Sequence, residues 1–161
     1  MIKLVYAQTQ DGVIGDDNKL PWSIPAEMKH FRQTTLHKNV LMGSKTFVSM
    51  NSRPLKNRLN IVLTRNPKKF EGIEAENLIF TSDVDALIKK YQGPANDDLY
   101  VIGGNEIFTI FFDCADEIIR SMILENYQGN VKISNYNFEN FKKINTIKEN
   151  EFEIEYFERK K

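Results

Sequence analysis

Short apolar runs alternate with segments of helical periodicity along almost the whole chain, and this alternation limits the possible folds more than any other feature. The first run, residues 2–7, has the nearly continuous apolar character of a buried strand. Further runs predict strands over residues 39–42, 59–63, 77–80, 99–102, 117–124, 141–147 and 152–159. Helical spacing of apolar residues predicts helices over residues 25–34, 84–91 and 105–112.

Strands and helices that alternate in this way favour an α/β fold, in which helices form the crossovers between parallel strands. We therefore predict a three-layer sandwich, with a central, mostly parallel, eight-stranded sheet flanked by about four helices. An antiparallel pair of strands near the C-terminus is expected to close the sheet. The longest irregular segment near the start, residues 11–23, is expected to be functional, as long loops in compact domains usually are.

Length and charge narrow the class of protein. The chain has 161 residues, which predicts a single domain over residues 1–161, because domains typically contain roughly 100–200 residues. Lys plus Arg and Asp plus Glu each number 22, so no net charge attracts nucleic acid or an anionic membrane. A small-molecule partner is therefore expected, and nothing in the sequence indicates an oligomer, so we expect a monomer.

The cysteine content and the first residues bear on the compartment. Cys114 is the only cysteine, which excludes an internal disulfide and fits a reducing compartment. The first residues lack the basic stretch and long apolar run of a secretory signal, and no run of about 18 apolar residues occurs. We expect a cytoplasmic protein with no membrane segment.

Glu27 is the first candidate functional residue, at the start of the helix predicted after Pro25. A glutamate in a first turn often does no more than complement the positive end of the helix dipole. Helical spacing, however, places Glu27 on a flank with Ile24 and Phe31, which directs its carboxylate at an apolar wall. A ligand with two adjacent N–H donors, such as a pterin, would bind this carboxylate through two charge-assisted hydrogen bonds. Burial would also raise the pKa of Glu27 and allow it to help deliver a proton.

The second candidate is the glycine pair Gly103-Gly104, which ends a predicted strand just before a helix. A backbone without Cβ atoms allows a diphosphate to approach closely, and a helix N-terminus offers free N–H groups to it. The alternative is that the pair only forms a turn. The spacing Gly-x-Gly-x-x-Gly is missing after every predicted strand, so a standard Rossmann fold is not expected.

Cations at two further strand ends form the third candidate site. Lys45 and Arg65 follow neighbouring predicted strands and would bracket a monoester phosphate if the strand ends meet. For either residue taken alone, a solvated surface charge is the favoured interpretation. Arg58 is either a loop charge or a ligand for a substrate carboxylate. His30 and His37 have no supporting carboxylate motif, so no metal site is expected.

Taken together, these motifs resemble the dihydrofolate reductase family. The resemblance rests on Gly12-Val13-Ile14-Gly15, Leu20-Pro21-Trp22, Ile102-Gly103-Gly104, and residues 5–7, 25–31, 43–46, 53–55 and 58. It covers nearly the whole length, and the order and spacing of the motifs make it specific. It implies reduction of dihydrofolate with NADPH as cofactor.

The resemblance also implies roles for individual residues. Catalytic roles fall to Trp22, Glu27 and Ser121, with Glu27 binding the pterin edge and supporting protonation of N5. Ser121 stands where the family usually has threonine, and its hydroxyl retains the hydrogen-bonding capacity. The implied substrate-binding residues are Val5, Glu27, Met28, Phe31, Met50, Arg53, Leu55, Arg58, Ile102 and Ser121, with Arg58 holding the glutamate carboxylate.

The implied cofactor-binding residues form three groups, and a mobile loop, residues 15–22, is expected to close over the nicotinamide. The nicotinamide side is bordered by Ala7, Val13, Ile14, Gly15 and Lys19. The residues that lie along the ribose and diphosphate are Gly43, Thr46, Gly103, Gly104, Asn105 and Ile107. The 2′-phosphate is surrounded by Lys45, Thr64 and Arg65.

Besides Ser121, three residues depart from the family pattern, and two other functions remain open. Ser44 stands where bacterial relatives often carry arginine, Phe108 replaces a frequent tyrosine, and Glu27 is longer than the aspartate common in bacterial members, although glutamate is used elsewhere in the family. One alternative is the related pyrimidine reductase of riboflavin synthesis, which shares the fold but should not need Trp22 with Glu27. The other is a folate-binding or NADPH-binding module without turnover.

Overall fold

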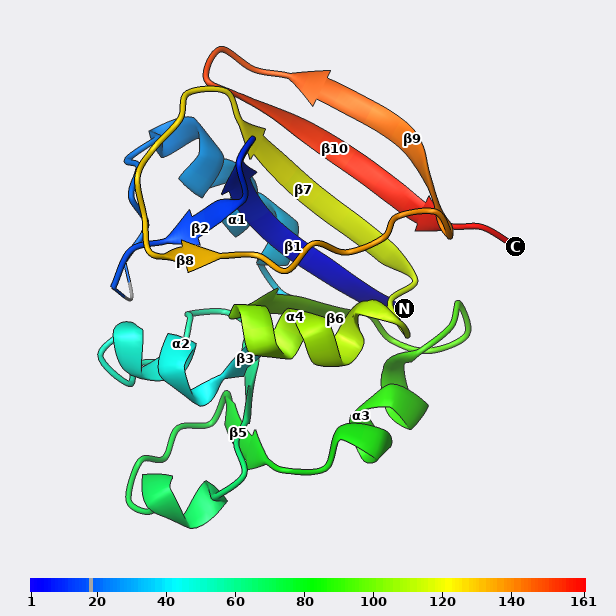
Figure 1. Cartoon of the computed structure of the whole chain (residues 1–161). Helices are drawn as coiled ribbons and strands as arrows, with labels where there is room; N and C mark the ends of the chain where they lie inside the picture. The colour runs from blue at the N-terminus through cyan, green and yellow to red at the C-terminus, as the bar shows by residue number, and fades with distance from the viewer. Residues whose placement is uncertain (18) are drawn as a thin grey trace.

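The computed structural model describes residues 1–17 and 19–161, and it contains one large and one small sheet (Figure 1). The strands of the large sheet are β1 (Ile2–Thr9), β3 (Asn39–Gly43), β4 (Leu59–Leu63), β5 (Leu78–Thr81), β6 (Leu99–Gly103), β7 (Glu117–Ile123), β9 (Phe141–Lys148) and β10 (Phe152–Arg159). The small sheet pairs β2 (Val13–Gly15) with β8 (Val131–Lys132). The helices are α1 (Pro25–Thr35), α2 (Ser44–Ser49), α3 (Val84–Tyr91), α4 (Asn105–Phe112) and the 3-10 helix η1 (Pro67–Phe70).

The large sheet has the strand order β5-β4-β3-β6-β1-β7-β10-β9. Every pair from β5 to β7 is parallel, whereas β10 runs antiparallel to both β7 and β9. The sheet is therefore eight-stranded and mostly parallel, with an antiparallel pair from the C-terminal region, as the sequence predicted. Parallel strands need crossovers, and the helices between β1 and β7 supply them.

Alternating side chains of the central strands feed two cores, one on each face of the sheet. On β1, Leu4 and Tyr6 pack into a core with residues of α3 and α4, whereas Val5 packs into a second core with Phe47 of α2. Partly buried Phe31 of α1 borders the second core. This alternation follows from the two-residue period of a strand, and it places α1 and α2 on one face and α3 and α4 on the other.

The sequence prediction missed the shortest elements. Residues 11–23 were expected to be irregular, but Val13–Gly15 forms β2 and pairs with β8. Neither β8, α2 nor η1 was predicted, because β8 has only two residues and the two short helices, of six and four residues, span fewer than two turns and show no helical spacing. Within the described residues, no helix has the length and apolar character needed to cross a membrane.

Candidate functional site

Glu27 lies in the first turn of α1 and is 7% exposed. The helix begins with Pro25 at its first position, after Ile24 at the N-cap, which has no side-chain hydrogen bond to the helix. Burial raises the pKa of Glu27, and the hydroxyl of Ser121 partly offsets the rise. Among the described residues, no cation lies within ion-pairing distance of this carboxylate.

Ser121 reaches Glu27 from the middle of the sheet. It belongs to β7, where its register partners are Ala7 of β1 and Ile154 of β10. Its buried side chain shares a face of the strand with Ile119 and Ile123 of the second core, which places the hydroxyl on the same side of the sheet as α1. A buried carboxylate beside a hydroxyl and without a cation is arranged to bind a ligand that brings its own N–H donors.

Apolar side chains form the wall beside Glu27. The second core contains Val5 and Trp22 as buried members, and Ala7, Phe31, Met50, Leu55 and Ile102 as partly buried ones. Partly buried residues of this kind leave apolar surface for a flat ring to cover. The structure therefore brings together most of the residues expected to contact the pterin and aminobenzoyl groups.

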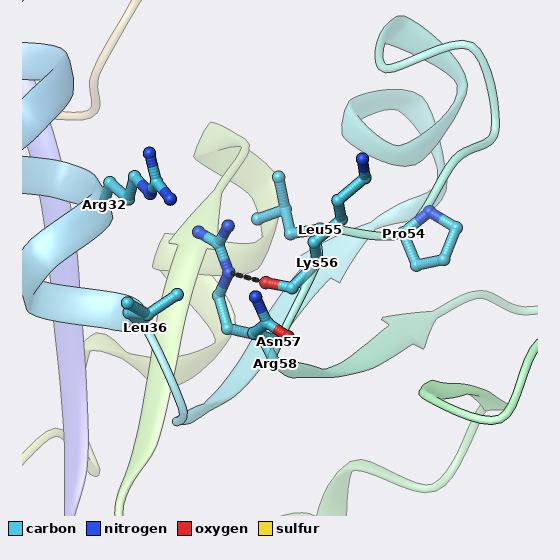
Figure 2. A pocket seen from close by; sticks show the side chains of 7 residues that line it. All are labelled: Arg32, Leu36, Pro54, Leu55, Lys56, Asn57 and Arg58. Atoms are coloured by element: carbon cyan, nitrogen blue, oxygen red, sulfur yellow. Dashed lines mark hydrogen bonds between the residues drawn. The ribbon is translucent and has the colours of Figure 1, made fainter.

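Arg58 lines a pocket of about 390 Å³ next to this wall. The pocket is lined by Arg32, Leu36, Pro54, Leu55, Lys56, Asn57 and Arg58. Figure 2 shows the guanidinium groups of Arg32 and Arg58 facing each other across it. Arg58 donates hydrogen bonds from Nε to the carbonyl oxygen of Lys56 (2.9 Å) and from Nη1 to the hydroxyl of Thr35 (3.1 Å). Burial, together with the neighbouring charge of Arg32, lowers the pKa of Arg58.

Arg32 was missing from the residues proposed from sequence, although its position offered a signal. It lies four residues after Met28 on α1, so helical geometry places the two on one flank. Two expected substrate-binding residues lie differently from the rest. Met28 is 59% exposed, and exposed Arg53 is not part of the pocket lining.

Because glycines have no side chain, they allow α4 to lie close to α2 and β3 at the candidate diphosphate site. Gly103 has a φ of 130°, a conformation that favours glycine, and its peptide bond to Gly104 is cis. A Cβ atom on Gly104 would lie 3.7 Å from the hydroxyl oxygen of Thr46. A Cβ atom on Gly43 would lie only 2.9 Å from Cγ1 of Ile107, so this approach requires glycine.

The N-terminus of α4 has no side-chain cap. Gly104 occupies the N-cap position and cannot accept a hydrogen bond through a side chain. The first N–H groups of a helix have no partners within the helix. These groups, together with the open backbone of the glycine pair, fit the diphosphate of a dinucleotide.

Lys45, Thr64 and Arg65 follow the carboxyl ends of the neighbouring strands β3 and β4. The parallel register pairs Gly43 with Leu63, so the residues that follow them share one edge of the sheet. Lys45 and Arg65 are exposed, and neither forms an ion pair with another described residue. The hydroxyl of Thr64 accepts a hydrogen bond from the backbone N–H of Asn66 (3.3 Å).

The loop between β2 and α1 lies against the segment around β8. Asn130 donates a hydrogen bond to the side chain of Asp17 (2.6 Å), and backbone hydrogen bonds join Asp16 and Lys19. Trp22 is buried edge-on against Tyr127, and its Nε1 is buried without a hydrogen-bond partner among the described residues. Such an N–H group calls for a ligand or a bound water. Asn18, which belongs to the expected mobile loop, lies outside the described residues.

Comparison with known proteins agrees with this geometry. A family model described as dihydrofolate reductase matches residues 1–159. The dihydrofolate reductase of Ureaplasma parvum is 33% identical over 162 residues, with 100% of this chain and 99% of the relative covered. That of Lactococcus lactis is 35% identical over 145 residues, with coverages of 89% and 84%.

A solved structure extends the agreement to three dimensions. Dihydrofolate reductase from Enterococcus faecalis, complexed with NADP(H) and RAB-propyl, superposes with a TM-score of 0.87 at 29% identity, covering 99% of this chain and 96% of that one. The family match covers residues 1–159 and therefore includes both the Glu27 region and the candidate diphosphate site. The chain therefore belongs to the dihydrofolate reductase family, and its activity is the NADPH-dependent reduction of dihydrofolate.

Proposed function

We propose that Glu27 is the group that binds the pterin edge and supports its protonation. The single observation that carries this assignment is a buried carboxylate that has only a hydroxyl beside it and no ion-pair partner among the described residues. The amidine-like edge of a pterin offers two N–H donors to such a carboxylate. Because burial raises its pKa, Glu27 keeps its proton to a higher pH than an exposed glutamate does, and it can pass that proton to N5 through a water molecule.

The other substrate-binding residues orient the ring and the tail. Val5 and Ile102 offer backbone carbonyls to the pterin, while Phe31, Met50 and Leu55 pack against the pterin and aminobenzoyl groups. Arg58 binds a carboxylate of the glutamate tail with its planar guanidinium group. The adjacent Arg32 adds a second positive charge to the same pocket.

The residues at the strand ends fit NADPH. The glycine pair and the uncapped start of α4 provide N–H donors for the diphosphate, and Lys45 and Arg65 provide two cations for the 2′-phosphate. When bound, NADPH supplies the hydride that reduces the pterin ring. Ala7, Val13, Ile14, Gly15 and Lys19 border the nicotinamide side. Trp22 and its loop exclude bulk water from the reacting atoms.

Further features of the proposal concern the whole chain. We propose that residues 1–161 form one domain that works as a monomer in the cytoplasm. The support for one domain is the continuous eight-stranded sheet, which carries the substrate and cofactor residues on neighbouring strands. Analytical ultracentrifugation at assay concentration tests the monomer, and a dimer would contradict it.

The test of Glu27 is the loss of NADPH absorbance with purified protein, NADPH and dihydrofolate, with each substrate omitted in turn. Loss that requires both substrates is expected, and Glu27→Gln should slow it by about 100-fold or more at neutral pH. Glu27→Asp, which keeps a carboxylate, should retain more activity than Glu27→Gln. Glu74→Gln, which changes an exposed carboxylate outside the proposed site, is the control. Near-normal turnover in Glu27→Gln would remove Glu27 from the mechanism.

A further inference from the structure

Residues 133–138, which we call the strap, directly follow β8 and form hydrogen bonds with the start of α4. Figure 1 shows the chain between β8 and β9 passing α4. Asn105, the first residue of α4, donates a hydrogen bond from Nδ2 to the hydroxyl of Ser134 (3.1 Å). The backbone N–H of Ser134 donates in return to Oδ1 of Asn105 (2.9 Å). The amide side chain of Asn105 is therefore bonded on both sides by one residue of the strap.

Tyr136 adds a second attachment to the same turn of α4. Its hydroxyl lies 2.7 Å from the hydroxyl of Thr109 and 3.3 Å from Oδ1 of Asn105. Thr109 also donates a hydrogen bond to the carbonyl oxygen of Asn105 (3.0 Å). The ring of Tyr136 stacks on Phe112 with centroids 4.5 Å apart. Both ends of the eight-residue helix are thus tied to the strap.

The strap has its own anchor on the other side. The backbone N–H of Ile133 donates to the carbonyl oxygen of Gly12 (2.9 Å), directly after β8 pairs with β2. The strap therefore does not move freely with α4. Through the strap, α4 is connected to Gly12 and β2, with which the helix itself forms no hydrogen bond among the described residues.

These contacts leave the Asn105 side chain committed to the strap. Asn105 can serve a bound diphosphate through its backbone N–H, and the uncapped Gly104 leaves this first turn open. The direction of these N–H groups depends on how the first turn of α4 is held. Misplacing donors by even a fraction of an ångström weakens hydrogen bonds to an anion, because these bonds are short and directional.

We propose that Ser134 and Tyr136 are positioning residues for the cofactor, which act through Asn105 to orient the first turn of α4 toward the diphosphate. This inference rests on the proposed placement of the NADPH diphosphate at the start of α4. Neither residue touches the diphosphate in this proposal. Both set the geometry of the donors that do, so their loss should affect binding of the diphosphate and spare the chemical step.

The test compares NADPH with adenosine 2′-monophosphate, which carries the 2′-phosphate but no diphosphate. Binding of NADPH is followed by the fluorescence of Trp22, the only tryptophan of the chain, and the nucleotide is measured as a competitive inhibitor. Tyr136→Phe keeps the stacked ring and removes the hydroxyl. It should raise the dissociation constant for NADPH about fivefold, the effect expected when one N–H group of the first turn loses its hydrogen bond to the diphosphate. The inhibition constant of the nucleotide and kcat at saturating NADPH should stay unchanged.

Ser134→Ala provides an independent variant, and Ser134→Thr, which keeps a hydroxyl, should restore the affinity lost in it. Tyr156→Phe removes a tyrosine hydroxyl from β10, outside the strap and α4, and should leave NADPH binding unchanged. Unchanged NADPH affinity in Tyr136→Phe and Ser134→Ala would overturn the inference, as would an equal loss for the adenosine nucleotide or a fall in kcat alone. A wild-type protein that does not bind NADPH would instead overturn the proposed cofactor site, and this inference with it.

Discussion

Gly129 packs so closely against Gly15 that a Cβ atom on Gly129 would overlap the Gly15 carbonyl oxygen. The same atom would also lie 2.6 Å from Cγ1 of Val13. The contact joins the segment before β8 to β2, the strand from which the active-site loop leaves. Only hydrogen fits between these backbones, so Gly129 fixes their separation.

We predict that Gly129→Ala forces β2 and β8 apart. Overpacking of this kind costs about 1–3 kcal/mol of unfolding free energy, and the displaced loop should also slow turnover. Urea denaturation and steady-state kinetics measure the two effects. Gly72→Ala is the contrasting variant: Gly72 has a φ of 89° and no neighbouring atom within 4 Å, so its loss reflects backbone strain alone, whereas Gly129 has no positive φ and its loss reflects the steric overlap. Wild-type stability and turnover in Gly129→Ala would show that the two segments separate freely.

The raised pKa of Glu27 predicts a pH dependence of stability in the ligand-free protein. The folded pKa lies above the ordinary value of 4.5, so the folded state favours the protonated carboxyl. The resulting stabilisation is complete below pH 4.5 and is lost as the pH rises through the folded pKa. Glu27→Gln, which stays neutral, should therefore have a higher Tm than wild type at about pH 8, and this advantage should disappear near about pH 4.

Thermal unfolding of the two proteins between about pH 4 and pH 8 measures this difference, with Glu74→Gln as a control for the loss of an exposed carboxylate. A Tm difference that stays constant across the range would mean that burial does not penalise the charged form of Glu27. Its assignment as the proton-delivering group would then lose its physical basis.

The sequence predicted the main elements well because each has its own local signal, an apolar run for a strand or helical spacing for a helix. The eight strands of the large sheet were all identified, and the spacing of Ile24, Glu27 and Phe31 by itself indicated a carboxylate at an apolar wall. The fold buries Glu27 at that wall. Local patterns of this kind predict the structure well, because the apolar residues that form the pattern are the ones that pack in the core.

Features that depend on distant partners were missed. β2 and β8 contain three and two residues, and each exists only because the other lies beside it. Asn105 stays a predicted cofactor contact through its backbone N–H, but the sequence did not indicate that its side-chain amide bonds to Ser134, which lies 29 residues away. No spacing rule within one segment could indicate this pair.

Arg58 is predicted to discriminate folates by their glutamate tail. Its side chain is held by the Thr35 hydroxyl, beside Arg32, in the pocket of Figure 2. Arg58→Leu should raise the dissociation constant for dihydrofolate about 10- to 100-fold, the effect of losing a hydrogen bond to a charged group. A pterin without the tail should bind the variant and the wild type equally. Arg53→Leu, outside the pocket lining, serves as the comparison and should have the smaller effect. Equal losses for both ligands would remove Arg58 from the substrate site.

Arg65 is predicted to distinguish NADPH from NADH. It lies with Lys45 at the ends of adjacent parallel strands, and Ser44 contributes no third charge. Because a cation beside a monoester phosphate forms charge-assisted hydrogen bonds, Arg65→Ala should weaken NADPH binding about tenfold. NADH has no 2′-phosphate, so its binding should change little. Lys69→Ala, which removes another exposed cation from η1, is the control for a general loss of positive charge. Raising the salt concentration should shrink the preference for NADPH in wild type more than in Arg65→Ala, because exposed charges are screened. Equal losses for the two nucleotides would show that Arg65 does not bind the 2′-phosphate.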